Sequence, residues 1–283
     1  MISIDFTPEE VAAGQMTAAH LAQAAGALRD DGIVVLNDVV DIDHIAQIRQ
    51  RMFSDVEEIL SHADVPFNWN TGNLQQDPPP IAPYLFRDVL ANDLAVQVTH
   101  TVLGDGLVNG MYSGNTALPS KNRQPVHADT GQLWPNLEAP TPAYAYVVNV
   151  PLVDVDARNG STEIWPGTHK DPSVVIGHDL KVTPEMLDKW RAVTTPIQPS
   201  IRAGSIVIRD IRLWHAGMPN HTDVPRPMIA MIHWVRWWPQ GGPLPFAPEA
   251  REILDHPVLK TNAKFVDGPI DYLYHNAAYE FEK

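Results

Sequence analysis

Apolar side chains recur at helical spacing in the first hundred residues of the chain. Between residues 42 and 61 they return every three or four positions, which predicts an amphipathic helix. Thr7-Pro8-Glu9-Glu10 has a capping-box pattern with proline in the first turn, so an Ala-rich helix is expected from there to about Gly32. The next segment, Ile33-Val34-Val35-Leu36, is continuously apolar and predicts a buried strand. A further helix is expected over 87–103.

Beyond residue 106 short apolar and β-branched runs alternate with turns, which is typical of strands. The expected strands are 107–114, 144–151, 162–165, 196–202, 205–210 and 227–236. A short helix is expected over 184–190. We therefore expect one domain spanning 1–283, with a helical part of about 1–105, a β barrel or sandwich of about 106–240, and a C-terminal extension of about 241–283.

Residues 64–86 break the pattern, because clustered prolines are incompatible with regular structure. Two interpretations stay open for this segment. It is either a solvated surface loop or a lid over a pocket, since long ordered loops in compact domains are often functional.

The bulk composition narrows the class of protein. The 283 residues include no cysteine and carry a formal net charge of −14. Disulfides, thiolate metal sites and cysteine nucleophiles are excluded, and a field of this sign opposes binding to nucleic acid or anionic membranes. No uninterrupted apolar stretch of about 18 residues is present. A soluble, cytoplasmic protein is expected.

Two histidines and an aspartate have a spacing that suits a metal ion. His127 and Asp129 are two residues apart after Pro125, which favours an extended segment in which both side chains face the same way. His215 follows the apolar run 205–209. Two imidazoles and one carboxylate cover one face of an octahedral ion and leave three positions open, as in non-haem Fe(II) oxygenases.

Other histidines are possible ligands, because a His-x-Asp pattern is a weak signal in a chain with 12 histidines. His169, His178, His221 and His233 could each serve in principle. His169 and His221 lie in polar turns, where hydrogen bonding at the surface is the simpler role. His233 lies in an apolar strand, where a hydrogen-bonded core histidine is the simpler role.

Arg226 strengthens the metal hypothesis. It follows His215 by eleven residues and is flanked by prolines. A guanidinium binds a carboxylate through two parallel hydrogen bonds, so Arg226 could hold the far end of a dicarboxylate whose 2-oxo acid end chelates the metal. An arginine at the surface is the alternative.

Three segments together resemble the phytanoyl-CoA dioxygenase family of Fe(II)/2-oxoglutarate oxygenases. They are Asp31-Gly32-Ile33-Val34-Val35-Leu36, then Asn159-Gly160-Ser161-Thr162-Glu163-Ile164-Trp165-Pro166-Gly167-Thr168-His169-Lys170, then Ala203-Gly204-Ser205-Ile206-Val207-Ile208 leading to His215 and Arg226. The resemblance covers most of the chain. It implies a mainly β fold with flanking helices, built on a double-stranded β-helix (jelly-roll, cupin-like) core.

The resemblance also implies the roles of individual residues. His127, Asp129 and His215 would ligate Fe(II) and form the catalytic centre, and Arg226 would bind the cosubstrate 2-oxoglutarate. Asn149 occupies a cosubstrate-facing place that is usually aromatic in the family, and Gln124 is expected to face the cosubstrate as well. The segment 159–170 is expected to be a structural turn.

The implied reaction consumes O2 and 2-oxoglutarate and releases succinate and CO2 while a small organic molecule is oxidised. Related halogenases replace the metal-binding carboxylate with a small residue, so Asp129 favours hydroxylation, or another oxidation such as desaturation or ring formation. Trp134, Trp214 and Trp69 are expected to contact a partly apolar or aromatic substrate. The expected setting of the reaction is specialised metabolism. Ordinary packing is the alternative for each tryptophan, and the oligomeric state is not predicted.

Two other classes of protein stay open. A cupin-like metalloenzyme such as an isomerase would share the barrel and the histidines but would not need Arg226. A non-catalytic relative that binds small molecules would be expected to lack a metal ligand, and here no ligand is missing.

Overall fold

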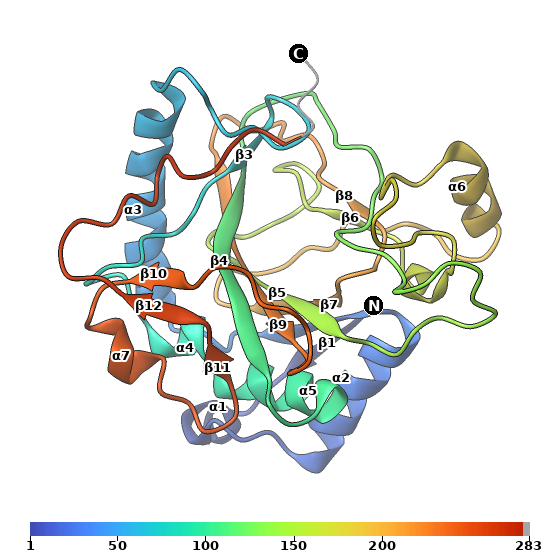
Figure 1. Cartoon of the computed structure of the whole chain (residues 1–283), viewed down its shortest axis with the longest axis horizontal. Coiled ribbons are helices and arrows are strands. Elements are labelled where there is room, and N and C mark those ends of the chain that lie inside the picture. The colour runs from blue at the N-terminus through green and yellow to red at the C-terminus, as the bar shows by residue number, and fades with distance from the viewer. Residues whose placement is uncertain (280–283) are drawn as a thin grey trace.

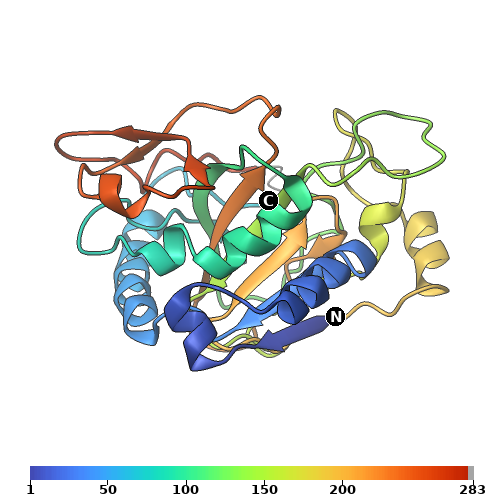
Figure 2. The same cartoon turned by 90° about the horizontal axis from the view of Figure 1, so that it is seen from below.

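The computed structural model describes residues 1–279 and contains one large twisted sheet with helices packed on one side (Figure 1, Figure 2). The order of its strands is β1-β2-β7-β5-β9-β4-β11, and β3 also pairs with β4. Their bounds are β1 Ile2–Asp5, β2 Ile33–Asn37, β3 Asn73–Gln75, β4 Val108–Ala117, β5 Ala145–Pro151, β7 Ile206–Asp210, β9 Arg226–Trp234 and β11 Lys260–Thr261.

A smaller layer faces the inner side of this sheet. Its regular part is the antiparallel pair β6 (Glu163–Ile164) and β8 (His215–Ala216). Isolated bridges extend it, joining His127 to His215 and Ile164 to Ile197. A separate parallel pair, β10 (Leu244–Phe246) and β12 (Ala263–Phe265), lies in the C-terminal extension.

The helices cover the outer face of the large sheet. They are α1 Pro8–Ala13, α2 Ala18–Asp30, α3 Ile42–Leu60, α4 Arg87–Leu90 and α5 Asp93–Leu103, with α6 Pro184–Arg191 and α7 Ala250–Ile253 elsewhere. The largest apolar cluster fills the space between sheet and helices and includes Leu28, Ile45 and Met52 together with Val148 and Ile208. Since the core occupies this face, the other face of the sheet is left to line a cavity.

Three predicted elements are confirmed closely: the helix 42–61, the strand beginning at Ile33 and the helix 184–190. The predicted long first helix is wrong, because it breaks at Gly14. This glycine adopts φ 59°, and a Cβ there would lie 2.9 Å from Cβ of Asp93. The predicted helix 87–103 also splits, because Asn92 caps a new helix by accepting from the backbone of Leu94 and Ala95.

Most of the predicted strands are confirmed with shifts of a few residues. The strand expected over 196–202 is wrong, since only isolated bridges at Ile197 and Ile201 form there. The first strand, β1, was not predicted. It pairs with β2 in parallel, so the N-terminal part adds two strands to the sheet as well as helices.

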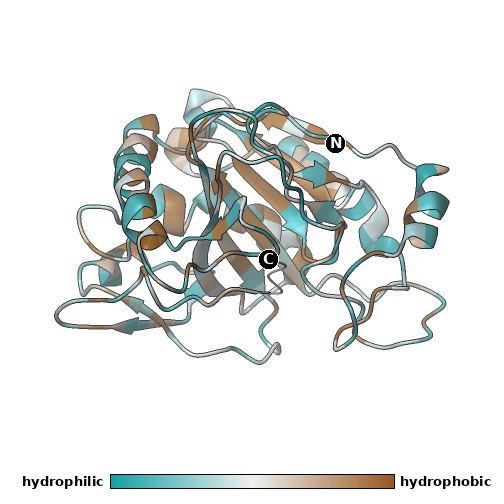
Figure 3. Ribbon diagram, turned by 90° about the horizontal axis from the view of Figure 1, so that it is seen from above, coloured by the Kyte–Doolittle hydropathy of each residue, from teal (hydrophilic) through white to brown (hydrophobic). Residues whose placement is uncertain are grey.

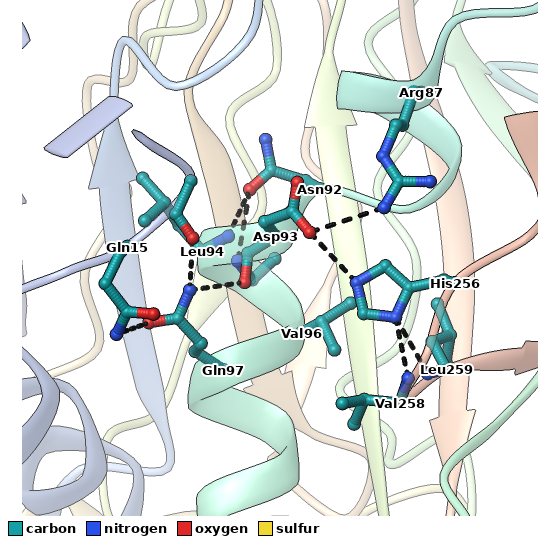
Figure 4. A network of polar contacts seen from close by, with 12 residues as sticks. Gln15, Arg87, Asn92, Asp93, Leu94, Val96, Gln97, His256, Val258 and Leu259 are labelled. Carbon is teal, nitrogen blue, oxygen red and sulfur yellow. Dashed lines mark hydrogen bonds and ion pairs between the residues drawn. The ribbon is translucent and has the colours of Figure 1, made fainter. Parts of the chain in front are cut away.

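The C-terminal extension is tied to the helical layer by the polar contacts in Figure 4. Nδ1 of His256 accepts hydrogen bonds from the backbone of Val258 and Leu259, each at 3.0 Å. Nε2 of the same ring is therefore the protonated nitrogen, and it donates to Oδ1 of Asp93 at 3.0 Å. Arg87 reaches the same carboxylate oxygen at 3.5 Å.

Apolar residues are concentrated on the strands of the large sheet, whereas the helices alternate between apolar and polar residues (Figure 3). Among residues 1–279 no helix is both long and apolar enough to cross a membrane.

His233 is a hydrogen-bonded core histidine, as predicted. Its Nδ1 lies 2.9 Å from the hydroxyl of Thr99, its side chain is buried, and burial lowers its pKa to about 3. The folded state favours the neutral form of His233. The contribution of this neutral side chain to the free energy of unfolding is complete above pH 6.5. It is lost as the pH falls from 6.5 towards 3, at about 1.4 kcal/mol per pH unit.

Urea unfolding at pH 7 and pH 5 checks this pH dependence. The wild-type protein should lose more stability over that interval than His233→Gln, which keeps a hydrogen-bonding group but cannot become charged. Equal losses in the two proteins would show that His233 does not titrate during unfolding.

Candidate metal centre and cosubstrate pocket

The structure brings His127, Asp129 and His215 together. His127 and His215 exchange backbone hydrogen bonds of 2.9 Å, so their rings lie side by side with 4.4 Å between centroids. Oδ1 of Asp129 is 3.9 Å from Nε2 of His127 and 3.4 Å from Nε2 of His215. The three ligand atoms lie within 4.8 Å of one another, which is close enough to hold one ion.

Each ring is oriented by its second nitrogen. Nδ1 of His127 donates to the carbonyl of Pro125 at 2.8 Å, and Nδ1 of His215 donates to the carbonyl of Leu213 at 2.9 Å. In the neutral form of each ring, Nε2 is then the unprotonated nitrogen, and it faces Asp129 as metal ligation requires. Burial, together with repulsion from His215, lowers the pKa of His127 to about 3 and keeps this imidazole neutral. Two imidazoles and one carboxylate fit Fe(II).

Asp129 has an unpredicted partner, Arg209. Nη2 of Arg209 donates to Oδ2 of Asp129 at 2.6 Å. Burial alone would raise the pKa of Asp129, but the positive charge of Arg209 opposes burial and holds this pKa well below the usual range. The signal in the sequence was a charged residue within the apolar run 205–210. Because side chains alternate along β7, Arg209 shares the inner face with Val207.

A cavity of about 300 Å³ lies over the metal-binding residues. Every second residue of β9 lines it, starting from Arg226 and continuing through Met228, Ala230 and Ile232. Val147 and Asn149 of β5 line it from the neighbouring strand. The wall is therefore largely aliphatic, with polar groups near the metal and at the end marked by Arg226.

Arg226 is 2% exposed, so its cation is shielded from water. Nη2 donates to the carbonyl of Gly160 at 2.7 Å, and Nε has no hydrogen-bond partner within residues 1–279. Burial lowers its pKa to about 10, which still leaves it charged at neutral pH. A buried guanidinium with an unused donor beside a metal-binding triad fits a carboxylate ligand such as 2-oxoglutarate.

Gln124 and Asn149 both line the cavity. Oε1 of Gln124 accepts from the backbone of Gly217 at 2.7 Å, which fixes its side chain next to β8. Nδ2 of Asn149 donates to the carbonyl of Ile229 at 3.3 Å. Each side chain is held by one backbone contact and is adjacent to the cavity.

The three tryptophans lie in different environments. The Trp69 ring packs against the His127 ring at 5.0 Å between centroids, and its backbone has an uncommon left-handed φ of 68°. Trp214 is fully buried in a separate cluster with Trp165, because it points away from the face of β8 that presents His215. Trp134 is 60% exposed and does not line the cavity. The expected substrate contacts of Trp134 and Trp214 do not fit these positions.

Two predictions about segments near the site need correction. Of the two interpretations of residues 64–86, the solvated surface loop is wrong, because β3 forms within them and Asn68 and Gln75 line the cavity. The lid stays a prediction. The segment 159–170 is more than a structural turn, because Ser161 and Thr162 also line it. His169, expected at the surface, is buried at 5% exposure.

This combination of a β sandwich, a two-histidine and one-carboxylate triad and a buried arginine defines the class of non-haem iron and 2-oxoglutarate-dependent oxygenases. The family model for phytanoyl-CoA dioxygenase matches residues 28–228. The chain therefore belongs to the phytanoyl-CoA dioxygenase family. The predicted family and the predicted enzyme class are confirmed.

Two curated relatives come from fungi. One is dioxygenase af480 of Aspergillus fumigatus, 29% identical over 140 residues, covering 49% of this chain and 40% of the relative. The other is the iron/alpha-ketoglutarate-dependent dioxygenase ausU of Aspergillus calidoustus, 26% identical over 226 residues, covering 73% of this chain and 68% of the relative. The match thus spans less than half of the first relative and about two thirds of the second.

Solved structures share the fold. The epimerase SnoN, in complex with Fe3+, alpha ketoglutarate and nogalamycin RO, aligns with a TM-score of 0.58 at 18% identity, covering 93% of this chain and 96% of SnoN. The carbocyclase SnoK from nogalamycin biosynthesis aligns with a TM-score of 0.56 at 16% identity, covering 75% of this chain and 83% of SnoK. These likenesses confirm the predicted mainly β fold with flanking helices.

Proposed function

We propose that the protein oxidises a small organic molecule with Fe(II), 2-oxoglutarate and O2, and releases succinate and CO2. The observation that carries this proposal is the buried, incompletely paired Arg226 in the same cavity as His127, Asp129 and His215. A metal site alone fits many enzymes, whereas a metal site with a buried cation facing the same cavity fits a chelating dicarboxylate.

Each residue has a proposed role. His127 and His215 would hold the iron through Nε2, and Asp129 would hold it through Oδ1. Arg226 pairs with the far carboxylate of 2-oxoglutarate, and Gln124 and Asn149 are adjacent polar groups that orient it. When bound, the iron and 2-oxoglutarate together activate O2 for removal of a hydrogen atom from the substrate.

The chain itself supplies position and exclusion of water. Aliphatic residues of β5, β7 and β9 line the cavity, so a substrate that fills it displaces solvent from the metal-facing side. Trp69 packs against His127 and is itself only 7% exposed, which shields one ligand from water. The carboxylate of Asp129 occupies the place that a halogenase leaves for chloride, which supports oxidation without halogenation.

Hydroxylation is the proposed outcome. Ring closure or epimerisation is the alternative, since the neighbours in structure include enzymes named as a carbocyclase and an epimerase. Both outcomes start with removal of hydrogen from carbon and need the same triad and the same arginine.

The proposed substrate is apolar over much of its surface, because aliphatic side chains such as Val147, Val207 and Ile232 form much of the wall. A role in specialised metabolism is supported by the nogalamycin biosynthesis named for one structural neighbour. A cytoplasmic location and a single functional domain over the whole chain are proposed on the sequence arguments.

Two other functions fit the site less well. A cupin-like isomerase has no use for a buried arginine aimed at a metal cavity. A binding protein without activity would not need a complete ligand set with both imidazoles oriented for metal, as His127 and His215 are here.

Replacement of Arg226 tests the cosubstrate role. With the redox-inert Mn(II) in place, calorimetry should show 2-oxoglutarate binding to the wild-type protein at least about 100-fold more tightly than to Arg226→Met, because loss of a buried charge pair costs roughly 3 kcal/mol or more. Arg158→Met, which removes an exposed arginine that pairs with Asp156, is the matched control and should bind as wild type does. Equal affinity in Arg226→Met and wild type would reject the anchoring role.

A further inference from the structure

Two buried arginines follow one another closely in the sequence and have different surroundings. Arg212 donates to Asp210 through Nε and Nη2 and to Thr141 through Nη1. Arg209 makes one side-chain hydrogen bond within residues 1–279, to Asp129, and its Nη1 is buried without a partner. Arg212 is saturated by its neighbours, as expected for a structural ion pair. Arg209 is directed at a single atom of one metal ligand.

The two oxygens of Asp129 face different partners. Oδ1 is the oxygen that approaches Nε2 of both His127 and His215. Oδ2 accepts the 2.6 Å hydrogen bond from Arg209, which makes it a charge-assisted contact. A free carboxylate could rotate or offer both oxygens to a metal. The occupied Oδ2 leaves Oδ1 as the available ligand atom.

Arg209 is well placed to hold this geometry. It lies on β7, where its backbone position is paired with Ile33 of β2 on one side and with Val147 of β5 on the other. Its side chain is 10% exposed, and the residue lines the cavity. Asp129, by contrast, lies outside any strand and keeps 32% of its side chain accessible. A rigid residue therefore restrains a less constrained one.

We infer that Arg209 is a positioning residue that holds Oδ2 of Asp129, so that Asp129 ligates the metal through Oδ1 alone and keeps the remaining coordination positions open. Open positions are what a chelating cosubstrate and O2 need at a facial triad. The inference rests on the proposed function for the identity of the metal site. Arg209 would thus help to set the number of metal ligands, although it lies on β7, a strand that supplies no ligand.

Metal binding measured without turnover tests this role. Wild type, Arg209→Met and Arg209→Lys are titrated with Co(II), whose visible absorption reports the number of ligands, and with Mn(II) by calorimetry. Arg209→Met should bind metal roughly 10–100-fold more weakly, the usual effect of losing a group that supports a ligand. Its Co(II) spectrum should also change, because Oδ2 becomes free to bind. Arg209→Lys, which keeps the charge, should recover part of the affinity.

Thermal unfolding of the metal-free proteins separates positioning from a structural role. A purely structural arginine would lower the melting temperature of Arg209→Met but leave its Co(II) spectrum and Mn(II) affinity equal to those of wild type, and that result would overturn the inference. If Arg209→Met does not fold, Arg209→Lys and Arg209→Gln carry the same comparison. Failure of wild type itself to bind metal would contradict the proposed function instead, so the two failures are distinguishable.

Discussion

His215→Ala is expected to abolish oxidative turnover and to weaken metal binding by more than the roughly 10–100-fold that loss of a supporting group costs. His215 supplies Nε2 at 3.4 Å from Oδ1 of Asp129, and its Nδ1 is committed to the carbonyl of Leu213. No histidine besides His127 and His215 belongs to the metal-binding cluster found among residues 1–279. Calorimetry with Mn(II) and an assay of succinate formation measure the two effects.

The control for this variant is His100→Ala. His100 is partly exposed and pairs with Asp105 at the surface, so its loss should leave metal affinity and turnover as in wild type. Normal turnover in His215→Ala would mean that another side chain ligates the metal, and the triad would have to be reassigned.

Arg212→Met is expected to destabilise the fold by about 3–5 kcal/mol, because it leaves the carboxylate of Asp210 buried without its counter-charge. The two side chains are 4% and 1% exposed and are joined by hydrogen bonds of 2.8 and 2.7 Å. Arg212 also donates to the carbonyl of Thr141, which fixes the loop before β5. The free energy of unfolding in urea measures the loss.

An exposed pair of the same kind provides the comparison. Arg202 donates to both carboxylate oxygens of Asp38, but the two side chains are 59% and 56% exposed. Solvent screening limits such pairs to about 1 kcal/mol or less, so Arg202→Met should change stability little. Similar losses in Arg202→Met and Arg212→Met would show that burial of Asp210 is not the source of the effect.

The metal site could be predicted largely from the spacing of its residues in the sequence. His127 and Asp129 share one face of an extended segment, and Arg226 opens the strand that follows His215. The resemblance of these residues to a known family then predicted the jelly-roll fold. The geometry that unites them comes from the bridge between His127 and His215, and no local pattern contains that bridge.

Arg209 and Arg212 could not be assigned from the sequence for a related reason. Arg209 bonds to a residue 80 positions away, and Arg212 reaches Thr141 across 71 positions. An arginine in an apolar strand signals burial but does not name its partner. The break at Gly14 is similar, because the close approach of Asp93 that requires glycine there arises only from helix packing.

The tryptophans show the limit of arguing from closeness in sequence. Trp214 adjoins a metal ligand, yet strand alternation sends its ring to the opposite side, into the cluster with Trp165. Trp69 lies 58 residues before His127 in the sequence and packs directly against its ring. Sequence distance is therefore a poor guide to the substrate side of this cavity.

Succinate formation from 2-oxoglutarate tests the central claim most directly. The purified protein should release succinate and CO2 when supplied with Fe(II), O2 and 2-oxoglutarate, slowly by itself and faster with a true substrate. A chelator or His215→Ala should stop this reaction. Absence of succinate, together with absence of 2-oxoglutarate binding to the metal-loaded wild-type protein, would contradict an oxygenase centred on His127, Asp129, His215 and Arg226.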